Sequence, residues 1–186
     1  LPMPGPGVAL PTTPSTGDQA LEAAPAQPII VTSALYSYTI STRGGAITQV
    51  TPSSYKSLYH ADKGEPVRLI PDSGSINQLG MIVGNDTLHF GDWTFTPSAR
   101  SLTVTSRDSL VLTAQRGEVG IALVYRFRAD DYQIDVSGRA VGLGPVGGTL
   151  LIGMGRGMRQ TEADTNANLY DYGVVTKTDE SKLVKF

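Results

Sequence analysis

One stretch of the chain constrains its fold more than any other: residues 119–128, where apolar and polar side chains alternate. Arg126 and Arg128 fall on one face of an extended chain, and the apolar residues share the other face: Val119, Ile121, Leu123, Tyr125 and Phe127. A period of two indicates a β-strand with one buried face. Residues 109–115 resemble a pairing partner, and Arg116-Gly117 between the two runs supplies a turn. The pattern predicts a long antiparallel hairpin.

Shorter runs of the same kind recur along the chain. Strands are predicted over 29–33, 35–40, 46–51, 67–70, 80–83, 87–90, 93–96, 102–105, 132–136 and 150–154, with an edge strand at 172–176. Residues 55–60 are compatible with a short helical turn, and no strongly amphipathic helix is evident. About ten to thirteen short, closely spaced strands are typical of stacked antiparallel sheets. We therefore expect an all-β antiparallel β-sandwich with little helix.

The first part of the chain differs from the rest in composition. Residues 1–27 contain no aromatic residue and no Lys or Arg, and together with Pro28 they hold seven of the 12 prolines. Such a segment buries too little apolar surface to offset its ordering entropy. The sequence predicts a Pro/Ala-rich linker over 1–27, with a turn of helix at 19–24, followed by one β-domain over 28–186.

Composition excludes several functions. The formal net charge is −2, and the densest basic stretch is only Arg126-Phe127-Arg128, so nucleic-acid binding is not expected. Cysteine is absent, which excludes disulfides, thiol nucleophiles and thiolate metal sites. No window approaches the roughly 20 apolar residues of a membrane span, so any span of a parent protein lies outside this chain.

Two motifs imitate ligand-binding loops. Gly142 to Gly147 matches G-x-G-x-x-G, but four glycines follow within ten residues and disfavour the helix that a dinucleotide site requires. We predict a loop between strands there. Asp164 to Asn168 imitates the start of a calcium loop, but Leu169 replaces the turn glycine and Val175 replaces the bidentate glutamate. An ordinary polar loop is expected.

Catalytic chemistry has no visible basis in the sequence. His60 and His89 are too few for a three-histidine metal site, and His89 is expected to be exposed or at a rim. No G-x-S-x-G elbow is present, and nothing favours any one pair of carboxylates among Asp92, Asp108, Glu118 and Asp135. The single tryptophan, Trp93, is expected to be a core or rim aromatic rather than a stacking platform. No catalytic, cofactor or metal residue is predicted, and the partner-binding residues stay unknown.

Several dispersed segments resemble a known bacterial family. Residues 35–56, with Arg43-Gly44-Gly45 inside a strand-turn-strand and Tyr55-Lys56 after it, are similar to the start of the large periplasmic (P1) domain of YidC-type membrane protein insertases. Val67 to Ile70 resembles the family's next short strand. Gly120 to Phe127 followed by Asp131 to Val136 is similar to a paired-strand element. The resemblance covers about residues 28–186.

The resemblance implies a β-supersandwich like that of sugar-binding and mutarotase-like domains. It implies a non-catalytic periplasmic domain, without cofactor, that acts as a docking or scaffolding surface. The full-length protein would lie in the cell inner membrane, with Sec translocon components and nascent membrane proteins as partners. The linker would follow a missing membrane span. The family's aromatic-rich segment before its second span is absent, so the expected domain is truncated at its C-terminus.

Two rival functions remain open on the sequence. A carbohydrate-binding module or mutarotase-like sugar epimerase requires His60 and His89 to converge with a carboxylate in one cleft, because acid–base catalysis needs hydrogen-bond reach to one substrate. A structural or adhesive β-domain requires no such site.

Overall fold

The computed structural model describes residues 25–145 and 147–166, and it confirms an all-β, sandwich-like fold. The elements are β1 (Pro28–Thr32), β2 (Tyr36–Ser41), β3 (Ile47–Pro52), β4 (Gln78–Val83), β5 (Asp86–His89), the 3-10 turn η1 (Phe90–Asp92), β6 (Thr96–Pro97), β7 (Ser101–Thr103), β8 (Arg107–Arg116), β9 (Val119–Arg128), β10 (Asp135–Val141) and β11 (Thr149–Gly153). The predicted helical turn at 19–24 and the predicted strand at 172–176 lie outside the described residues.

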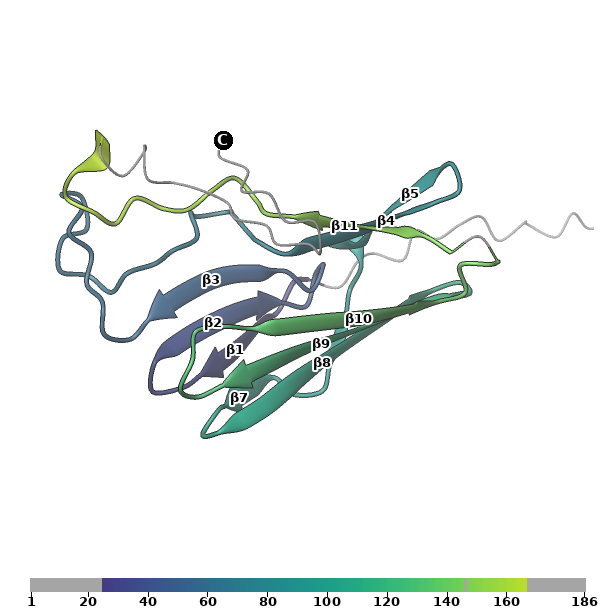
Figure 1. Ribbon diagram of the computed structural model, residues 1–186, viewed down its shortest axis with the longest axis horizontal. Coiled ribbons are helices and arrows are strands. Elements are labelled where there is room, and N and C mark those ends of the chain that lie inside the picture. Colours follow the sequence, from purple (N-terminus) through teal and green to yellow (C-terminus); the bar gives the residue numbers. More distant parts are fainter. Residues whose placement is uncertain (1–24, 146, 167–186) are drawn as a thin grey trace, which may run out of the picture.

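Two four-stranded sheets form the sandwich. One has the strand order β3-β2-β1-β7 and the other β10-β9-β8-β6 (Figure 1). The neighbouring strands pair antiparallel except for β1 and β7, which run parallel. The predicted hairpin is present as β8 and β9, paired in register from Arg107 with Arg128 to Arg116 with Val119. Gly117 has a φ of 57° in the turn, a conformation that favours glycine.

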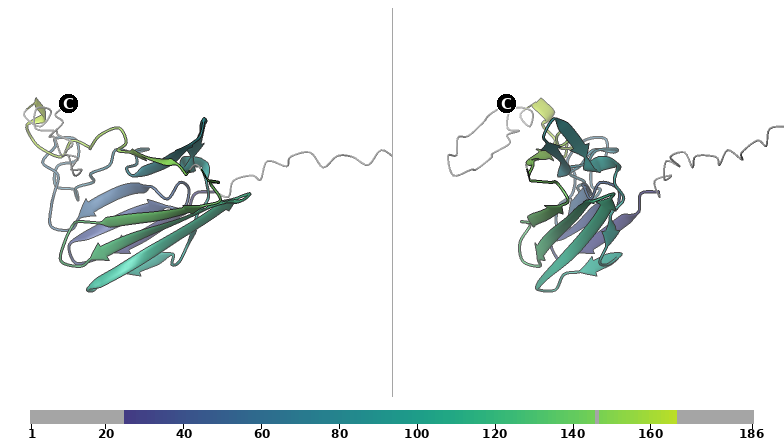
Figure 2. Two further views of the ribbon diagram at one scale, coloured as in Figure 1. Left: turned by 45° about the vertical axis from the view of Figure 1, so that its right-hand side comes forward. Right: turned by 90° about the vertical axis from the view of Figure 1, so that its right-hand side faces the viewer.

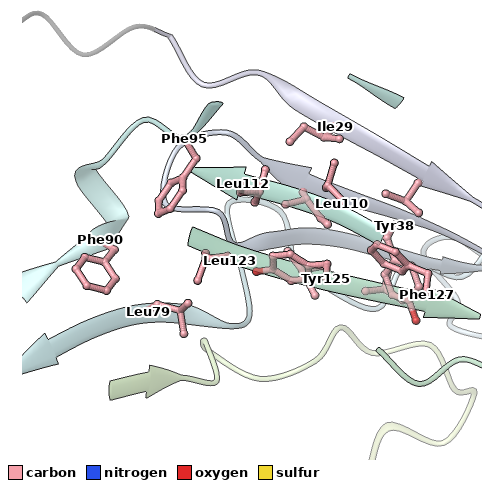
Figure 3. Packing of buried hydrophobic residues seen from close by; sticks show 14 of the residues in the cluster. Ile29, Tyr38, Leu79, Phe90, Phe95, Leu110, Leu112, Leu123, Tyr125 and Phe127 are labelled. Carbon is pink, nitrogen blue, oxygen red and sulfur yellow. The ribbon is translucent and has the colours of Figure 1, made fainter. Parts of the chain in front are cut away.

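The core fills the space between these sheets. The alternation predicted for residues 119–128 is confirmed, because the apolar face of β9 is buried while Arg126 points outward. Figure 3 shows this face packed with residues from β1, β2 and β8. The most deeply buried large side chains are Tyr36, Tyr125, Phe90, Phe95, Phe127, Ile29, Ile40, Leu110 and Leu112. Burial of apolar area on this scale is the main stabilising term of such a domain.

A third sheet, of strand order β11-β4-β5, lies beside the sandwich (Figures 1 and 2). Leu79 of β4 and Phe90 of η1 join the same buried cluster as the β9 residues. Asn77, immediately before β4, donates a hydrogen bond of 2.7 Å from Nδ2 to the Tyr125 hydroxyl. The third sheet is therefore attached to the sandwich by both apolar packing and a polar contact.

Tyrosine hydroxyls connect segments that are distant in the sequence. Tyr125 donates to the Gly45 carbonyl at 2.6 Å across the sandwich. Tyr36 donates to the Arg128 carbonyl and Tyr38 to the Tyr132 carbonyl, each at 2.8 Å. These bonds satisfy phenol groups inside the core and tie the first sheet to the end of the second.

Three of the predicted strands differ from the structure. Residues 67–70 are irregular, although Val67 and Ile70 are buried, because the Leu69 amide bonds the Val50 carbonyl while the Leu69 carbonyl accepts the Arg159 amide, outside any ladder. The strand predicted at 93–96 is reduced to an Arg43–Thr94 bridge and the two residues of β6. The strand predicted at 132–136 begins only at Asp135, because the preceding residues form a turn.

The turn before β10 has its own hydrogen bonds. The Gln133 amide donates to Asp131 Oδ1 at 3.0 Å, and the Tyr132 carbonyl accepts the Tyr38 hydroxyl. Both groups are thereby withdrawn from strand pairing. Residues 55–60, predicted as a possible helical turn, form no helix: they are mostly irregular, with an isolated bridge from Lys56 to Pro66.

We predict that Tyr125→Phe lowers the free energy of unfolding by about 1–3 kcal/mol, because it removes the partner of the Gly45 carbonyl and of the Asn77 amide. Urea denaturation measures the change. Tyr55→Phe is the control, since Tyr55 is 58% exposed, and its change is expected within about 0.5 kcal/mol. Equal effects of the two substitutions would contradict the role assigned to the Tyr125 hydroxyl.

Alkaline pH supplies a second prediction. Burial raises the pKa of Tyr125 and of Tyr38 from 10.0 to about 12. The folded domain therefore holds these protons more tightly than the unfolded chain does. The stability they contribute is complete below about pH 10 and is lost as the pH rises toward 12. Urea denaturation across this window should show a falling free energy of unfolding, with a shallower slope for Tyr125→Phe; an unchanged slope would show that Tyr125 does not titrate in this way.

Candidate docking surface

Two consecutive strands, β10 and β11, end their sheets. Within the described residues β10 pairs only with β9, and β11 pairs only with β4. In Figures 1 and 2 the two strands lie one above the other, joined by the connection 142–148 at one end of the molecule. Each strand thus presents one row of backbone N–H and C=O groups that no neighbouring strand of the described chain occupies.

The inner face of β10 is only partly covered. Val136 stands opposite Tyr125 in the β9–β10 register and so faces the core side of the sheet. Tyr125 is 0% exposed, whereas Val136 is 40% exposed. The apolar layer of the sandwich therefore continues to β10, where no layer formed by the described residues buries it fully.

The third sheet shows the same feature more strongly at β11. Ile152 stands opposite Leu79, so both side chains point to the same face of the sheet. Leu79 is 8% exposed, but Ile152 is 55% exposed. Leu151, on the other face, is 38% exposed. β11 carries no charged residue and no proline, so it lacks the features with which sheet edges usually avoid pairing.

We use the name edge surface for the exposed apolar residues of β4, β10, β11 and the segment after β11. Its members are Ile82, Val136, Val141, Leu150, Leu151, Ile152, Met154 and Met158. They make up most of the large apolar side chains that are exposed in the described chain. Exposed apolar groups on and beside strands that have an unpaired edge, as on β10 and β11, are typical of interaction sites.

Sequence reasoning did not identify this surface. It predicted a strand at 150–154, which β11 confirms, but an uncharged run such as Leu150 to Ile152 is usually buried on both faces. The uncharged run itself is the available sequence signal, because such a run indicates an interface when both of its faces are exposed. Only the absence of a covering layer distinguishes the two cases.

The glycine motif at Gly142 to Gly147 confirms the expectation of a loop. It connects β10 to β11, and a strand rather than a helix follows it. Gly142 has a φ of 77°, and a Cβ there would overlap the Glu118 carbonyl. The close approach of the backbone to Glu118 is therefore sufficient to require glycine at this position. At Asp164, Oδ1 accepts the Asn166 amide at 3.0 Å, and the remainder of that predicted loop lies outside the described residues.

The histidines are placed in different parts of the fold. His60 lies in the connection between β3 and β4, beside Tyr59 at a ring distance of 4.3 Å. His89, exposed as expected, ends β5. Tyr59, next to His60, donates its amide to the Thr161 carbonyl, whereas His89 pairs with Gly80 of β4. In the described ranges, no three His, Asp or Glu side chains are grouped as a metal site would need.

All four candidate carboxylates are exposed, and two of them, Asp108 and Asp135, lie at the same hollow. Asp92 pairs with Arg43 at 3.2 Å, and Glu118 lies in the β8–β9 turn. Asp108 and Asp135 line a hollow of about 380 Å³ together with Arg107, Arg126 and Arg128. Arg128 is held in turn by Asp131 at 3.2 Å. Acidic and basic groups balance around this hollow, so its charge favours neither an anion nor a cation.

Trp93 is 5% exposed, which confirms a core or rim aromatic. Its ring lies 5.3 Å from Phe90, and the Arg116 guanidinium lies 5.1 Å from the ring centre. Phe90 and Arg116 thus cover the indole ring, on which a sugar would have to stack.

These features define a β-sandwich domain in which, among the described residues, β10 and β11 each leave one edge unpaired. Comparison with protein families matches residues 28–185 to the YidC periplasmic domain. The match spans most of the chain, and the chain therefore belongs to the family of periplasmic domains of YidC membrane insertases. It is not a known enzyme family. No curated protein matches the chain. Among the described residues, no helix has the length and hydropathy to span a bilayer.

The openness of β11 leads to a stability prediction. Ile152→Ser should change the free energy of unfolding by no more than about 0.5 kcal/mol, because the side chain is mostly exposed. Leu79→Ser, at the paired position on β4, should cost more than about 2 kcal/mol, since it empties a buried site. Urea denaturation of both variants measures the difference. A large loss for Ile152→Ser would show that β11 is covered in solution.

Proposed function

We propose that this domain is a docking surface of a membrane insertase, and that the edge surface binds extended segments of nascent inner-membrane proteins. The single observation that carries the proposal is β11: an uncharged strand, unpaired on one side among the described residues and exposed on both faces. An extended segment that pairs with this edge gains main-chain hydrogen bonds and buries apolar side chains at alternate positions. Family membership supports the setting.

The proposed setting extends the family assignment. The domain lies in the periplasm, its full-length protein lies in the inner membrane, and residues 1–27 form a tether between them. Contact with Sec translocon components belongs to the same proposal. Each of these statements rests on family membership and on the composition of the first segment, which is rich in proline and poor in apolar side chains of the kind that build a core.

The geometry favours docking over sugar chemistry. An epimerase needs two acid–base groups in one cleft. His60 follows Tyr59, whose amide bonds the Thr161 carbonyl, whereas His89 ends β5 and pairs with Gly80. A stacking platform needs an accessible aromatic face, and Trp93 is buried. A purely structural domain would need no unprotected edge, and β11 is such an edge.

Site-specific crosslinking tests the docking role. A photoreactive residue replaces Leu151 of β11 in the full-length insertase that carries this chain, in cells that synthesise a stalled inner-membrane protein with a periplasmic segment. We expect a crosslink to the stalled protein, because Leu151 lies on the open edge. The matched control is Ile30, also 38% exposed, which lies on β1 between β2 and β7. Equal yields at the two positions would refute docking at the edge surface.

A further inference from the structure

The register between β9 and β10 shows which side chains of β10 lie on each face of the sheet. Asp135, Ser137, Arg139 and Val141 stand opposite Arg126, Val124, Ala122 and Gly120 on the outer face of the sheet, and Val136, Gly138 and Ala140 stand opposite core residues. A hydrogen bond of 2.8 Å from Arg126 Nη1 to Ser137 Oγ shows that these two side chains share the outer face. An incoming strand would meet two faces of different chemistry.

The charges on the outer face are unevenly compensated. Asp135 stands opposite Arg126, which supplies a neighbouring positive charge. Arg139 stands opposite Ala122, and the next residue across the sheet is Thr113. Within the residues that the structure describes, Arg139 makes no ion pair and no side-chain hydrogen bond. Ala122 occupies the cross-strand position beside Arg139 on β9. A carboxylate could therefore face Arg139 only from a strand on the open side of β10.

The inner face of the same strand is shallow and apolar. Val136 is 40% exposed, and Gly138 has no side chain. Leu123 fills the space beside Gly138, because its Cδ2 methyl group lies 3.2 Å from the position that a Cβ of residue 138 would take. No charged group of β10 points inward, because its charged residues, Asp135 and Arg139, both lie on the outer face. An incoming strand would have to place small or medium apolar side chains on this side.

We propose that the β10 edge selects an extended segment in which apolar and polar residues alternate and an Asp or Glu stands opposite Arg139. The proposal rests on docking by strand addition and names the chemistry of the partner. Opposite charges at directly paired positions stabilise a sheet and like charges destabilise it. An acidic residue opposite Arg139 should tighten binding about 2- to 5-fold relative to a neutral one, and a basic residue should weaken it by a similar factor.

Peptide binding to the full chain tests the selection. The probes are fluorescently labelled peptides of about nine residues, the length of a long strand. Val and Thr alternate in them, and the central residue is Glu, Thr or Lys. The pattern is symmetric about its centre, so that residue can stand opposite Arg139 in a parallel or an antiparallel pairing. Fluorescence anisotropy is expected to rank the affinities as Glu over Thr over Lys.

Charge reversal provides the decisive comparison. Arg139→Glu should reverse the order to Lys over Thr over Glu, and Arg139→Gln should remove the difference between the charged peptides. Arg100→Glu is the matched control: it makes the same change in net charge at an exposed position between β6 and β7, so the original order should persist. Circular dichroism checks that each variant keeps its strand content, which is expected because Arg139 is exposed.

The outcomes separate the two proposals. If the three peptides bind the native chain equally well, or if Arg139→Glu leaves their order unchanged, selection by Arg139 is overturned while docking by strand addition stands. If Arg100→Glu reverses the order as Arg139→Glu does, overall charge and not the local pair governs binding, and the selection is again overturned. If no peptide binds, strand addition at this edge fails as well.

Discussion

The packing of β9 against the first sheet is the contact on which the rest of the structure depends. Tyr125 stands at its centre: its ring is fully buried, its hydroxyl donates to the Gly45 carbonyl, and the same oxygen accepts the Asn77 amide. One side chain thus joins the second sheet, the β2–β3 turn and the start of the third sheet. Because a buried phenol needs partners, these three segments are held in one arrangement.

That arrangement also determines which surfaces remain open. The deepest burial lies where β8 and β9 face β1 and β2, and it declines toward β10. Attachment of the third sheet through Leu79 and Asn77 covers one side of β4 but leaves Ile152, opposite Leu79, mostly exposed. The edge surface is therefore a consequence of how the three sheets meet, and its apolar character is the same chemistry that builds the core.

Much of the fold could be predicted from local pattern. The β8–β9 hairpin, the strand-turn-strand around Gly44 and the loop at Gly142 follow from alternation and from glycine at turns. Residues 67–70 were predicted wrongly, because apolar alternation does not reveal that the Leu69 carbonyl is engaged by Arg159 from a distant segment. β10 begins later than predicted for a related reason: Tyr132 accepts a hydrogen bond from Tyr38, which lies 94 residues away in the chain.

The sequence by itself determined the strand periodicity, the identity of the buried face of β9, the lack of cysteine chemistry and the resemblance to a YidC periplasmic domain. Only the tertiary structure decided that Ile152 is open while Leu79 is buried. It also decided that, among the described residues, β10 and β11 end their sheets and no carboxylate stands across from Arg139. The physical reason is that alternation specifies the two faces of a strand, whereas its two edges are satisfied by whichever segments fold beside it.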